Sequence, residues 1–168
     1  PHPVALRLDP QMRLGVGTMD GRVYFRTGDG FVEAPMPNPQ PGDMVTFLVP
    51  DGPNTVWIGC ASGLYRWRSG RIDKLPPDAG LPTREPKVLE IDPHGNFWLG
   101  TLLGLFRIPR VELEAVLDGR QPTLQAVTYG PSNGMPAATS FSLGFLHASD
   151  RTPDGHLWFG TTLGGMEV

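Results

Sequence analysis

The sequence predicts an all-β protein made of β-propeller blades, with about four repeats of about 41 residues in a partial ring. Pairs of glycines four residues apart recur in four places, at Gly17 and Gly21, Gly59 and Gly63, Gly100 and Gly104, and Gly160 and Gly164. The intervals between successive pairs are 42, 41 and 60 residues, so the last one contains an insertion. Short apolar runs separated by turn residues fill each period, and a period near 40 with several strands is typical of propeller blades.

Each repeat also has a tryptophan two residues before the first glycine, except in the first copy. An indole offers a large face for packing between blades, while its N–H still needs a partner. The glycine that follows would let neighbouring backbone approach. We therefore interpret these residues as structural rather than as a ligand cage. They are Gly17, Trp57, Gly59, Trp98, Gly100, Trp158 and Gly160.

The strands can be assigned in order along the chain. Residues 4–8 alternate apolar and other side chains, as a half-buried strand would, and residues 14–17 and 23–25 follow as the next strands. Gly-Asp-Gly at 28–30 is a hairpin signal into a fourth strand. The prediction is a four-stranded antiparallel meander per blade, with blades at about 4–35, 44–76 and 87–130, and an incomplete one at 139–168.

The third repeat carries a predicted helical insertion near 110–118. Pro109 is able to start a helix, and Asp118-Gly119 is able to end one. The segment is long enough for about two turns. We expect it to cover the edge of a blade; its alternative role is a docking surface for a neighbouring domain or subunit.

Composition excludes some classes of function. The 168 residues include 22 glycines and 19 prolines, which fall on the repeat period, and the formal net charge is −3. This charge gives no electrostatic footprint for nucleic acid, so we expect none to be bound. The single cysteine, Cys60, cannot form an intramolecular disulfide, and it stands where the other repeats have threonine.

The repeat resembles a known family. Residues 92–107, which begin Asp-Pro-His-Gly-Asn-Phe-Trp-Leu-Gly-Thr, together with residues 50–66 and 152–161, resemble the two-component regulator propeller repeat. Residues 108–120 and 127–135 are similar to the elaborated late blade in the periplasmic sensor propellers of bacterial hybrid histidine kinases and diguanylate cyclases. In those sensors a polar segment with Glu, Cys and paired Gly commonly follows; residues 136–144 depart from that pattern.

The resemblance implies a function. It implies a sensory, ligand-binding propeller segment of a bacterial membrane-bound signal-transduction protein, on the periplasmic side of the inner membrane and not itself catalytic. It also implies a parent that forms a homodimer, with the remaining blades of the parent chain as partners and a small molecule or a carbohydrate as ligand. We expect no cofactor. Four blades do not close the usual ring of six to eight, so we expect further blades elsewhere in a longer protein.

The ligand site is expected at one face of the propeller. Crossings into the innermost strand of a blade and loops between its second and third strands share that face, near the channel mouth. Ligand sites favour such concave mouths on rigid scaffolds. The candidate ligand-binding residues there are Arg84, Glu85, Lys87, Thr101, Ser140 and Phe141.

Two other functions stay open. One is a propeller enzyme of the streptogramin lyase type, which would need a histidine with acid/base partners and a metal-binding carboxylate. The four histidines, His2, His94, His147 and His156, show no metal-ligand spacing, so no catalytic or metal residues are predicted. The other is a purely structural protein-interaction scaffold. A ligand screen would separate the scaffold from the sensor.

Overall fold

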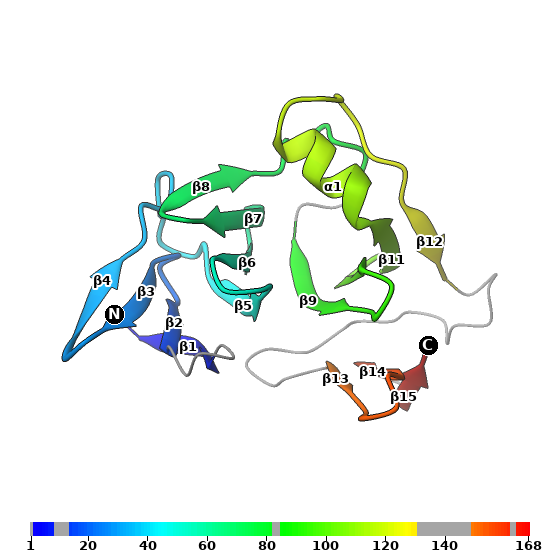
Figure 1. Cartoon of the computed structure of the whole chain (residues 1–168), viewed down its shortest axis with the longest axis horizontal. Helices are drawn as coiled ribbons and strands as arrows, with labels where there is room; N and C mark the ends of the chain where they lie inside the picture. The colour runs from blue at the N-terminus through cyan, green and yellow to red at the C-terminus, as the bar shows by residue number, and fades with distance from the viewer. Residues whose placement is uncertain (1, 9–13, 82–84, 131–148, 162–163) are drawn as a thin grey trace. The chain divides into compact units, whose positions relative to one another are not determined.

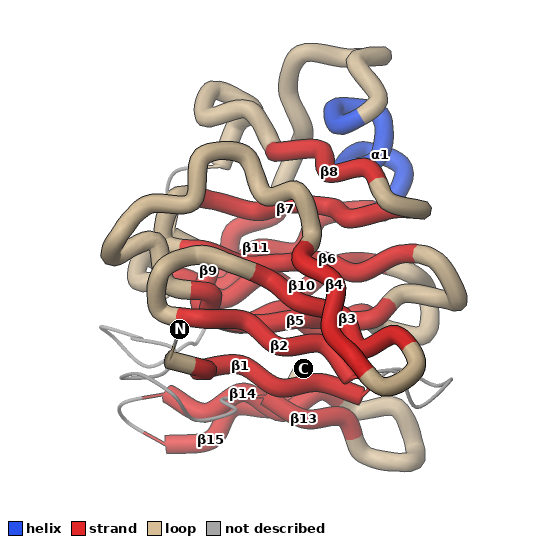
Figure 2. The backbone as a smooth tube through the Cα atoms, turned by 90° about the vertical axis from the view of Figure 1, so that its left-hand side faces the viewer, coloured by secondary structure: helices blue, strands red, loops and turns tan. Residues whose placement is uncertain are grey.

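The protein consists of four antiparallel sheets that follow the four repeats in order, so the propeller-blade prediction is confirmed. The computed structural model describes residues 2–8, 14–81, 85–130, 149–161 and 164–168. The chain divides into two compact units, Pro1–Leu75 and Pro76–Val168, with two sheets in each. Figure 1 labels the elements along the chain. Figure 2 shows the backbone turned by 90°, with the strands in red and the helix in blue.

Unit 1 contains two four-stranded meanders. In each, the order of the strands in the sheet is their order in the chain, so strands that follow one another in sequence are neighbours in the sheet. The first sheet consists of β1 (Pro3–Leu8), β2 (Leu14–Thr18), β3 (Val23–Thr27) and β4 (Gly30–Glu33). The second consists of β5 (Val45–Pro50), β6 (Thr55–Cys60), β7 (Gly63–Arg68) and β8 (Arg71–Lys74).

An apolar cluster of described residues joins the two sheets of unit 1. The innermost strand β5 packs against β1 and β2 of the preceding blade. Val23 from the first sheet and Val45 and Ile58 from the second are almost completely buried in one cluster. At the start of β5, Val45 pairs with Cys60 and Phe47 pairs with Gly59, so Thr46 is an extra residue in the ladder. Such an irregularity bends a strand and re-aims the residues beside it.

Unit 2 contains the third and fourth repeats. Its first sheet consists of β9 (Pro86–Ile91), β10 (Asn96–Thr101), β11 (Gly104–Pro109) and β12 (Val127–Tyr129). Its second has three strands among the described residues, β13 (Ser149–Arg151), β14 (Leu157–Thr161) and β15 (Gly164–Glu167). Trp98 and Leu105 of the first sheet share a buried cluster with Phe159 of the second, so Trp98 contributes to the packing between these two sheets.

The predicted helical insertion is confirmed. Helix α1 (Arg110–Leu117) follows directly on β11, and Pro109 and Asp118 flank it (Figure 1). Its buried residues are Leu113, Ala115, Val116 and Leu117. Val111, in the first turn of the helix, is exposed. The helix therefore packs through its buried apolar residues. No described helix is long and apolar enough to cross a membrane.

In two repeats the tryptophan indole is hydrogen-bonded to an aspartate of the preceding turn. The indole Nε1–H of Trp57 donates to Asp51 Oδ2 at 2.9 Å, and that of Trp98 donates to Asp92 Oδ2 at 3.0 Å. In both repeats the aspartate lies six residues before the tryptophan. The last repeat has Thr152 in that place, and its tryptophan, Trp158, is 42% exposed.

Gly17 and Gly59 make room for side chains rather than for backbone, which corrects the sequence-based interpretation at these two positions. A Cβ on Gly17 would lie 2.4 Å from Val45 Cγ1, and one on Gly59 would lie 2.4 Å from Phe47 Cε1. Val45 belongs to the next blade, whereas Phe47 is the strand partner of Gly59. The glycine thus accepts a large neighbour from the innermost strand in both repeats.

The hydrogen bonds that Asp92 accepts from Asn96 and Trp98 should stabilise the fold in a pH-dependent way. Partial burial on its own would raise the pKa of the Asp92 carboxyl, but hydrogen bonds from Asn96 and Trp98 outweigh it and hold the pKa below its usual range. A group with a depressed folded pKa stabilises the fold above its unfolded pKa, and this stabilisation is lost as the pH falls through the folded pKa. We expect Asp92→Asn to cost on the order of 1 kcal/mol at pH 7.

Thermal unfolding of both proteins as a function of pH checks this expectation. The Tm difference between wild type and Asp92→Asn should shrink as the pH falls below about 4, the unfolded value for an aspartate. Asp78→Asn, at an exposed position, is the control and should leave Tm unchanged. A Tm difference that stays constant down to pH 2 would show that the carboxylate charge is not what Trp98 and Asn96 recognise.

Candidate functional site

The turn between the second and third strands is closed by a threonine in three of the four repeats. Thr101 Oγ1 accepts the Leu103 N–H at 3.0 Å and lies 3.2 Å from the Gly104 carbonyl oxygen, and Thr161 Oγ1 donates to Gly164 O at 2.8 Å. Thr18 is the third such residue. In the second repeat this place is taken by Cys60, whose thiol is completely buried. Burial raises the pKa of the Cys60 thiol well above its ordinary value, and the nearby Asp43 carboxylate adds to the effect.

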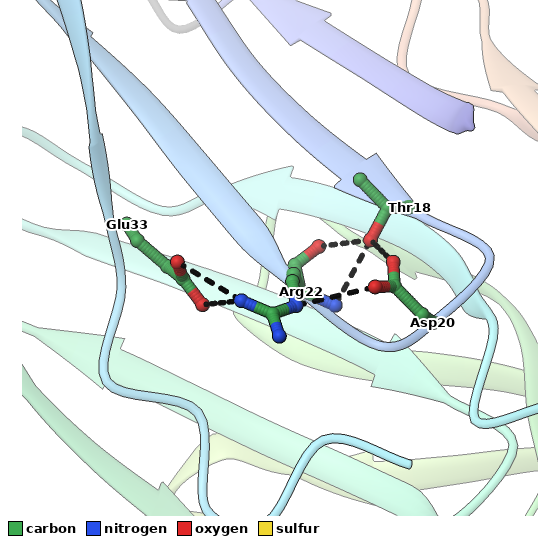
Figure 3. Close-up of polar contacts among 4 residues, drawn as sticks. All are labelled: Thr18, Asp20, Arg22 and Glu33. Carbon is green, nitrogen blue, oxygen red and sulfur yellow. Dashed lines mark hydrogen bonds and ion pairs between the residues drawn. The ribbon is translucent and has the colours of Figure 1, made fainter. Parts of the chain in front are cut away.

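The first repeat extends this closure into a charged network (Figure 3). Thr18 Oγ1 accepts the Arg22 N–H at 3.0 Å and donates to Asp20 Oδ1 at 2.6 Å. That hydrogen bond holds the pKa of the exposed Asp20 carboxyl below its usual range. The Arg22 guanidinium bridges Asp20 on one side, at 3.2 Å, and Glu33 of β4 on the other, at 3.1 Å. The β2–β3 turn is therefore tied to the edge strand of its own blade.

The second repeat closes its turn by a different set of groups. The Asp43 carboxylate, in the crossing between β4 and β5, accepts the Ser62 N–H and the Ser62 hydroxyl, each at 2.7 Å. Ser62 Oγ also lies 2.7 Å from the hydroxyl of Tyr65, so the two share a hydrogen bond. The Ala61 N–H donates to the Met44 carbonyl beside them. The crossing and the β6–β7 turn therefore lie together, as the propeller geometry predicts.

A surface pocket of about 520 Å³ opens beside this hydrogen-bonded chain. It lies entirely within unit 1. Its lining comes from Pro37, Asn38 and residues 40–43 of the crossing, from Ala61 and Ser62 of the turn, and from Tyr65 and Lys74 of β7 and β8. The Lys74 ammonium lies over the Tyr65 ring, 5.1 Å from its centroid. The pocket thus has a carboxylate and an ammonium in its wall, with two hydroxyl groups and several apolar ring and methyl groups.

Gly21, in the β2–β3 turn of the first repeat, packs closely against Asp43 in the pocket lining. Gly21 has φ +77°, and a Cβ there would lie 2.7 Å from the carbonyl oxygen of Asp43. The network in Figure 3 holds this turn in place on one side, and Asp43 packs against it on the other. The position of the Asp43 carboxylate therefore depends on both blades of unit 1.

We expect Gly21→Ala to disturb the pocket and to cost about 1 kcal/mol or more, because the backbone conformation is left-handed and the added methyl group meets a carbonyl oxygen. Chemical denaturation gives the cost, and the backbone amide signals of Asp43 and Ser62 in a ¹H–¹⁵N spectrum should move. Gly28→Ala is the matched control, since Gly28 also has a positive φ but nothing within 4 Å. Equal shifts of the Ser62 amide in both variants would show that Gly21 does not support the pocket.

The structure describes three of the six residues predicted to bind ligand. The Lys87 ammonium is ion-paired with the Glu85 carboxylate, and the Lys87 side chain is 15% exposed. Thr101 is completely buried, and its hydroxyl closes the β10–β11 turn. Arg84, Ser140 and Phe141 lie outside the described residues. A ligand-binding role for these six residues stays a prediction.

The sequence pattern pointed to crossings and second-turn loops but not to the particular residues of this pocket. The rule that places crossings and second-turn loops on one face was applied to the residues before β9. Applied to the residues before β5, the same rule points to Asp43, and the exchange of threonine for Cys60 marks the repeat that departs from the pattern. Tyr65 and Lys74, by contrast, carry no signal in the sequence, because strand pairing alone brings them to the pocket.

No group of three or more His, Cys, Asp or Glu side chains is placed to hold a metal ion within the part of the chain that the structure describes. Among the described histidines, His156 contacts the Glu167 carboxylate through Nδ1 at 2.5 Å, in the last sheet of unit 2. This pair is exposed at the end of a turn. It belongs to unit 2 and takes no part in the pocket, which lies in unit 1.

The fold and the pocket together define the chain as a set of β-propeller blades with a polar pocket between a crossing and a turn. No protein-family model and no curated protein sequence matches it. Among solved structures it is similar to the extracellular domain of the hybrid two-component system BT3049 from B. thetaiotaomicron. The TM-score is 0.70 and the identity 18%, over 98% of this chain and 21% of that one. For the extracellular domain of BT4673 from the same organism, the TM-score is 0.70 and the identity 17%, over 99% of this chain and 20% of that one.

A second kind of propeller is also similar. Virginiamycin B lyase from Staphylococcus aureus gives a TM-score of 0.65 at 18% identity, over 99% of this chain and 55% of the lyase chain. This chain therefore spans about a fifth of the two-component chains and about half of the lyase. At these identities the likeness establishes the fold. The fold expected from the two-component propeller repeat is thereby confirmed.

Proposed function

We propose that this chain is a ligand-binding segment of a sensory propeller in a bacterial membrane-bound signalling protein of the two-component or diguanylate cyclase type. The segment lies on the periplasmic side of the inner membrane and is not itself catalytic. The observation that carries the proposal is the pocket of unit 1, because its loops stand on two packed meanders that hold Asp43, Ser62 and Tyr65 in fixed positions. Likeness of fold to extracellular domains of two-component systems supports it.

The mechanism follows from the stiffness of the blades. Loops on a rigid scaffold keep a binding site formed before the ligand arrives. A ligand held between the crossing and the β6–β7 turn would tie two blades more firmly to each other, because Gly21 of one blade already packs on Asp43 of the next. Rigid-body movement of blades or of whole subunits then suits the transmission of the signal better than rearrangement inside a blade. The remaining blades and a second copy of the parent are the partners that this mechanism needs.

Reading the gene outward from both ends of this segment tests the proposal. We expect further blades, a membrane span, and a kinase or cyclase domain in the same frame. A reporter phosphatase that works only after export, fused within the propeller of the full-length protein, should be active. A reading frame that closes as a single propeller without a membrane span, or an inactive fusion that is expressed, would contradict the proposal.

The lyase likeness gives a second candidate a defined assay. A virginiamycin B lyase structure in the comparison contains quinupristin, so this compound is the natural probe. Under the sensor proposal, the chain and its full-length parent leave quinupristin unchanged. Loss of quinupristin that scales with protein concentration would favour the enzyme instead.

A further inference from the structure

The pocket in unit 1 occurs where the repeat departs from its own pattern. Three repeats close the turn after the second strand with a threonine hydroxyl that bonds to the backbone of the turn, whereas Cys60 stands in the second repeat. In the second repeat the turn is instead held by the hydrogen bonds from Ser62 to Asp43, and both residues line the surface pocket. Local departures from a consistent pattern are expected at functional sites. The extra residue Thr46 in β5 lies next to the same place.

The two charges of the pocket are not paired with each other. Asp43 uses both carboxylate oxygens on Ser62, and each oxygen keeps a second lone pair for another donor. Lys74 lies over the Tyr65 ring, and within the described residues its ammonium makes no ion pair. Tyr65 is 1% exposed, so its ring and hydroxyl form a fixed wall between the two charges. A ligand is thus offered an acceptor at one end and a cation at the other.

This pair of charges selects a ligand with two kinds of group. A carboxylate on the ligand would meet Lys74 in a charge-assisted hydrogen bond, which is stronger than a neutral one. Hydroxyl or ammonium donors on the ligand would meet the free lone pairs of Asp43. Pro37, Pro41 and Ala61 supply apolar contact for the carbon chain. A polyol without a charge would satisfy Asp43 but leave Lys74 without a partner.

We propose that this pocket binds a small organic acid that carries hydrogen-bond donors, a hydroxy acid or an amino acid, with its carboxylate toward Lys74 and its donors toward Asp43. The inference rests on the proposed function, because it names the class of ligand that the sensor segment would take. It is nonetheless tested separately. The reporter fusion and the reading frame decide the sensor proposal, and ligand binding by the chain decides this one.

The chain contains two lysines, Lys74 and Lys87, which makes a direct measurement available. Reductive ¹³C-methylation keeps the charge of each ammonium and gives each lysine its own signal, which Lys74→Gln assigns. The probes are gluconate, L-glutamine and sorbitol, the last of which matches gluconate in its hydroxyl groups but lacks the carboxylate. The titration extends from micromolar to millimolar concentrations, because the affinity of a small ligand depends on how well its groups are matched and not on its size alone.

We expect gluconate, L-glutamine or both to shift the Lys74 signal at millimolar concentration, and sorbitol to leave it in place. A shift with gluconate alone identifies a hydroxy acid, and one with L-glutamine alone an amino acid. Isothermal titration should show binding weakened about tenfold in Lys74→Gln, which corresponds to about 1.4 kcal/mol. Arg26→Gln, which removes a charge from an exposed position of β3 outside the pocket lining, is the control and should bind as wild type does.

Three outcomes would overturn the inference. The first is that neither acid shifts the Lys74 signal, and the second is that sorbitol shifts it as strongly as gluconate does. The third is a shift of the Lys87 signal alone, which would place binding in unit 2. Asp43→Asn adds an independent check, because it keeps the size of the side chain while removing the charge. It should weaken L-glutamine, with its ammonium group, more than gluconate.

Discussion

Trp57→Ala is expected to cost about 3–5 kcal/mol, the range for removing a buried large aromatic side chain. Trp57 is 0% exposed, and its indole N–H donates to Asp51 Oδ2 at 2.9 Å. Across the sheet it pairs with Arg66, which is itself buried and ion-paired with Asp73 at 2.8 Å. The alanine would leave a cavity beside a buried charge. Denaturant unfolding followed by far-UV circular dichroism measures the loss.

The repeat supplies a matched control for this variant. Trp158 occupies the same place in the last repeat but is 42% exposed, and among the described residues it has no indole acceptor. Trp158→Ala should therefore cost less, about 1–2 kcal/mol. Asp51→Asn separates the hydrogen bond from the packing and should cost about 1 kcal/mol. If the two tryptophan variants lost equal free energy of unfolding, the burial and hydrogen bond of Trp57 would not be what stabilises the second blade.

The fold could be predicted because its signals are local and repeated. A glycine pair at a fixed spacing and turn residues between apolar runs identify a meander, and each copy strengthens the others. Pro109 and Asp118 bracket the helix for the same reason, since helix ends leave a signature in the sequence. The hydrogen-bond partner of the Trp57 and Trp98 indoles also leaves a signal in the sequence. An aspartate stands six residues before each, on the turn that leads into the same strand.

The candidate pocket could be predicted only in part, because it depends on contacts between segments. That a crossing and a turn share one face follows from the topology. The particular chain from Asp43 through Ser62 to Tyr65 depends instead on side-chain directions across 19 residues of sequence, and Lys74 is brought there by β7–β8 pairing. The sequence also suggested the wrong kind of neighbour for Gly17 and Gly59, where side chains and not backbone take the space. The periodicity shows that space is needed beside Gly17, whereas only the packed structure shows that Val45 takes it.

Gly17→Ala is the second large effect, expected to cost about 1–3 kcal/mol or more through overpacking. The new Cβ would lie 2.4 Å from Val45 Cγ1 and 2.7 Å from Val45 Cβ, and real Cβ atoms do not approach so closely. Val45 is 1% exposed in the core that joins the two blades of unit 1, so it has little room to withdraw. The strain would fall on the packing between blades rather than on hydrogen bonds within a blade.

Two further variants isolate that cause. Gly30→Ala adds the same methyl group where nothing lies within 4 Å, so it should be neutral or slightly stabilising. Combining Gly17→Ala with Val45→Ala removes both Cγ methyl groups and leaves only the contact with the Cβ of residue 45, so the double variant should be more stable than the sum of the single losses predicts. Simple additivity would show that Gly17 is required for its own strand and not for the contact with β5. A positive coupling would locate the repeat glycine's role at the junction of two blades, next to the crossing that carries Asp43.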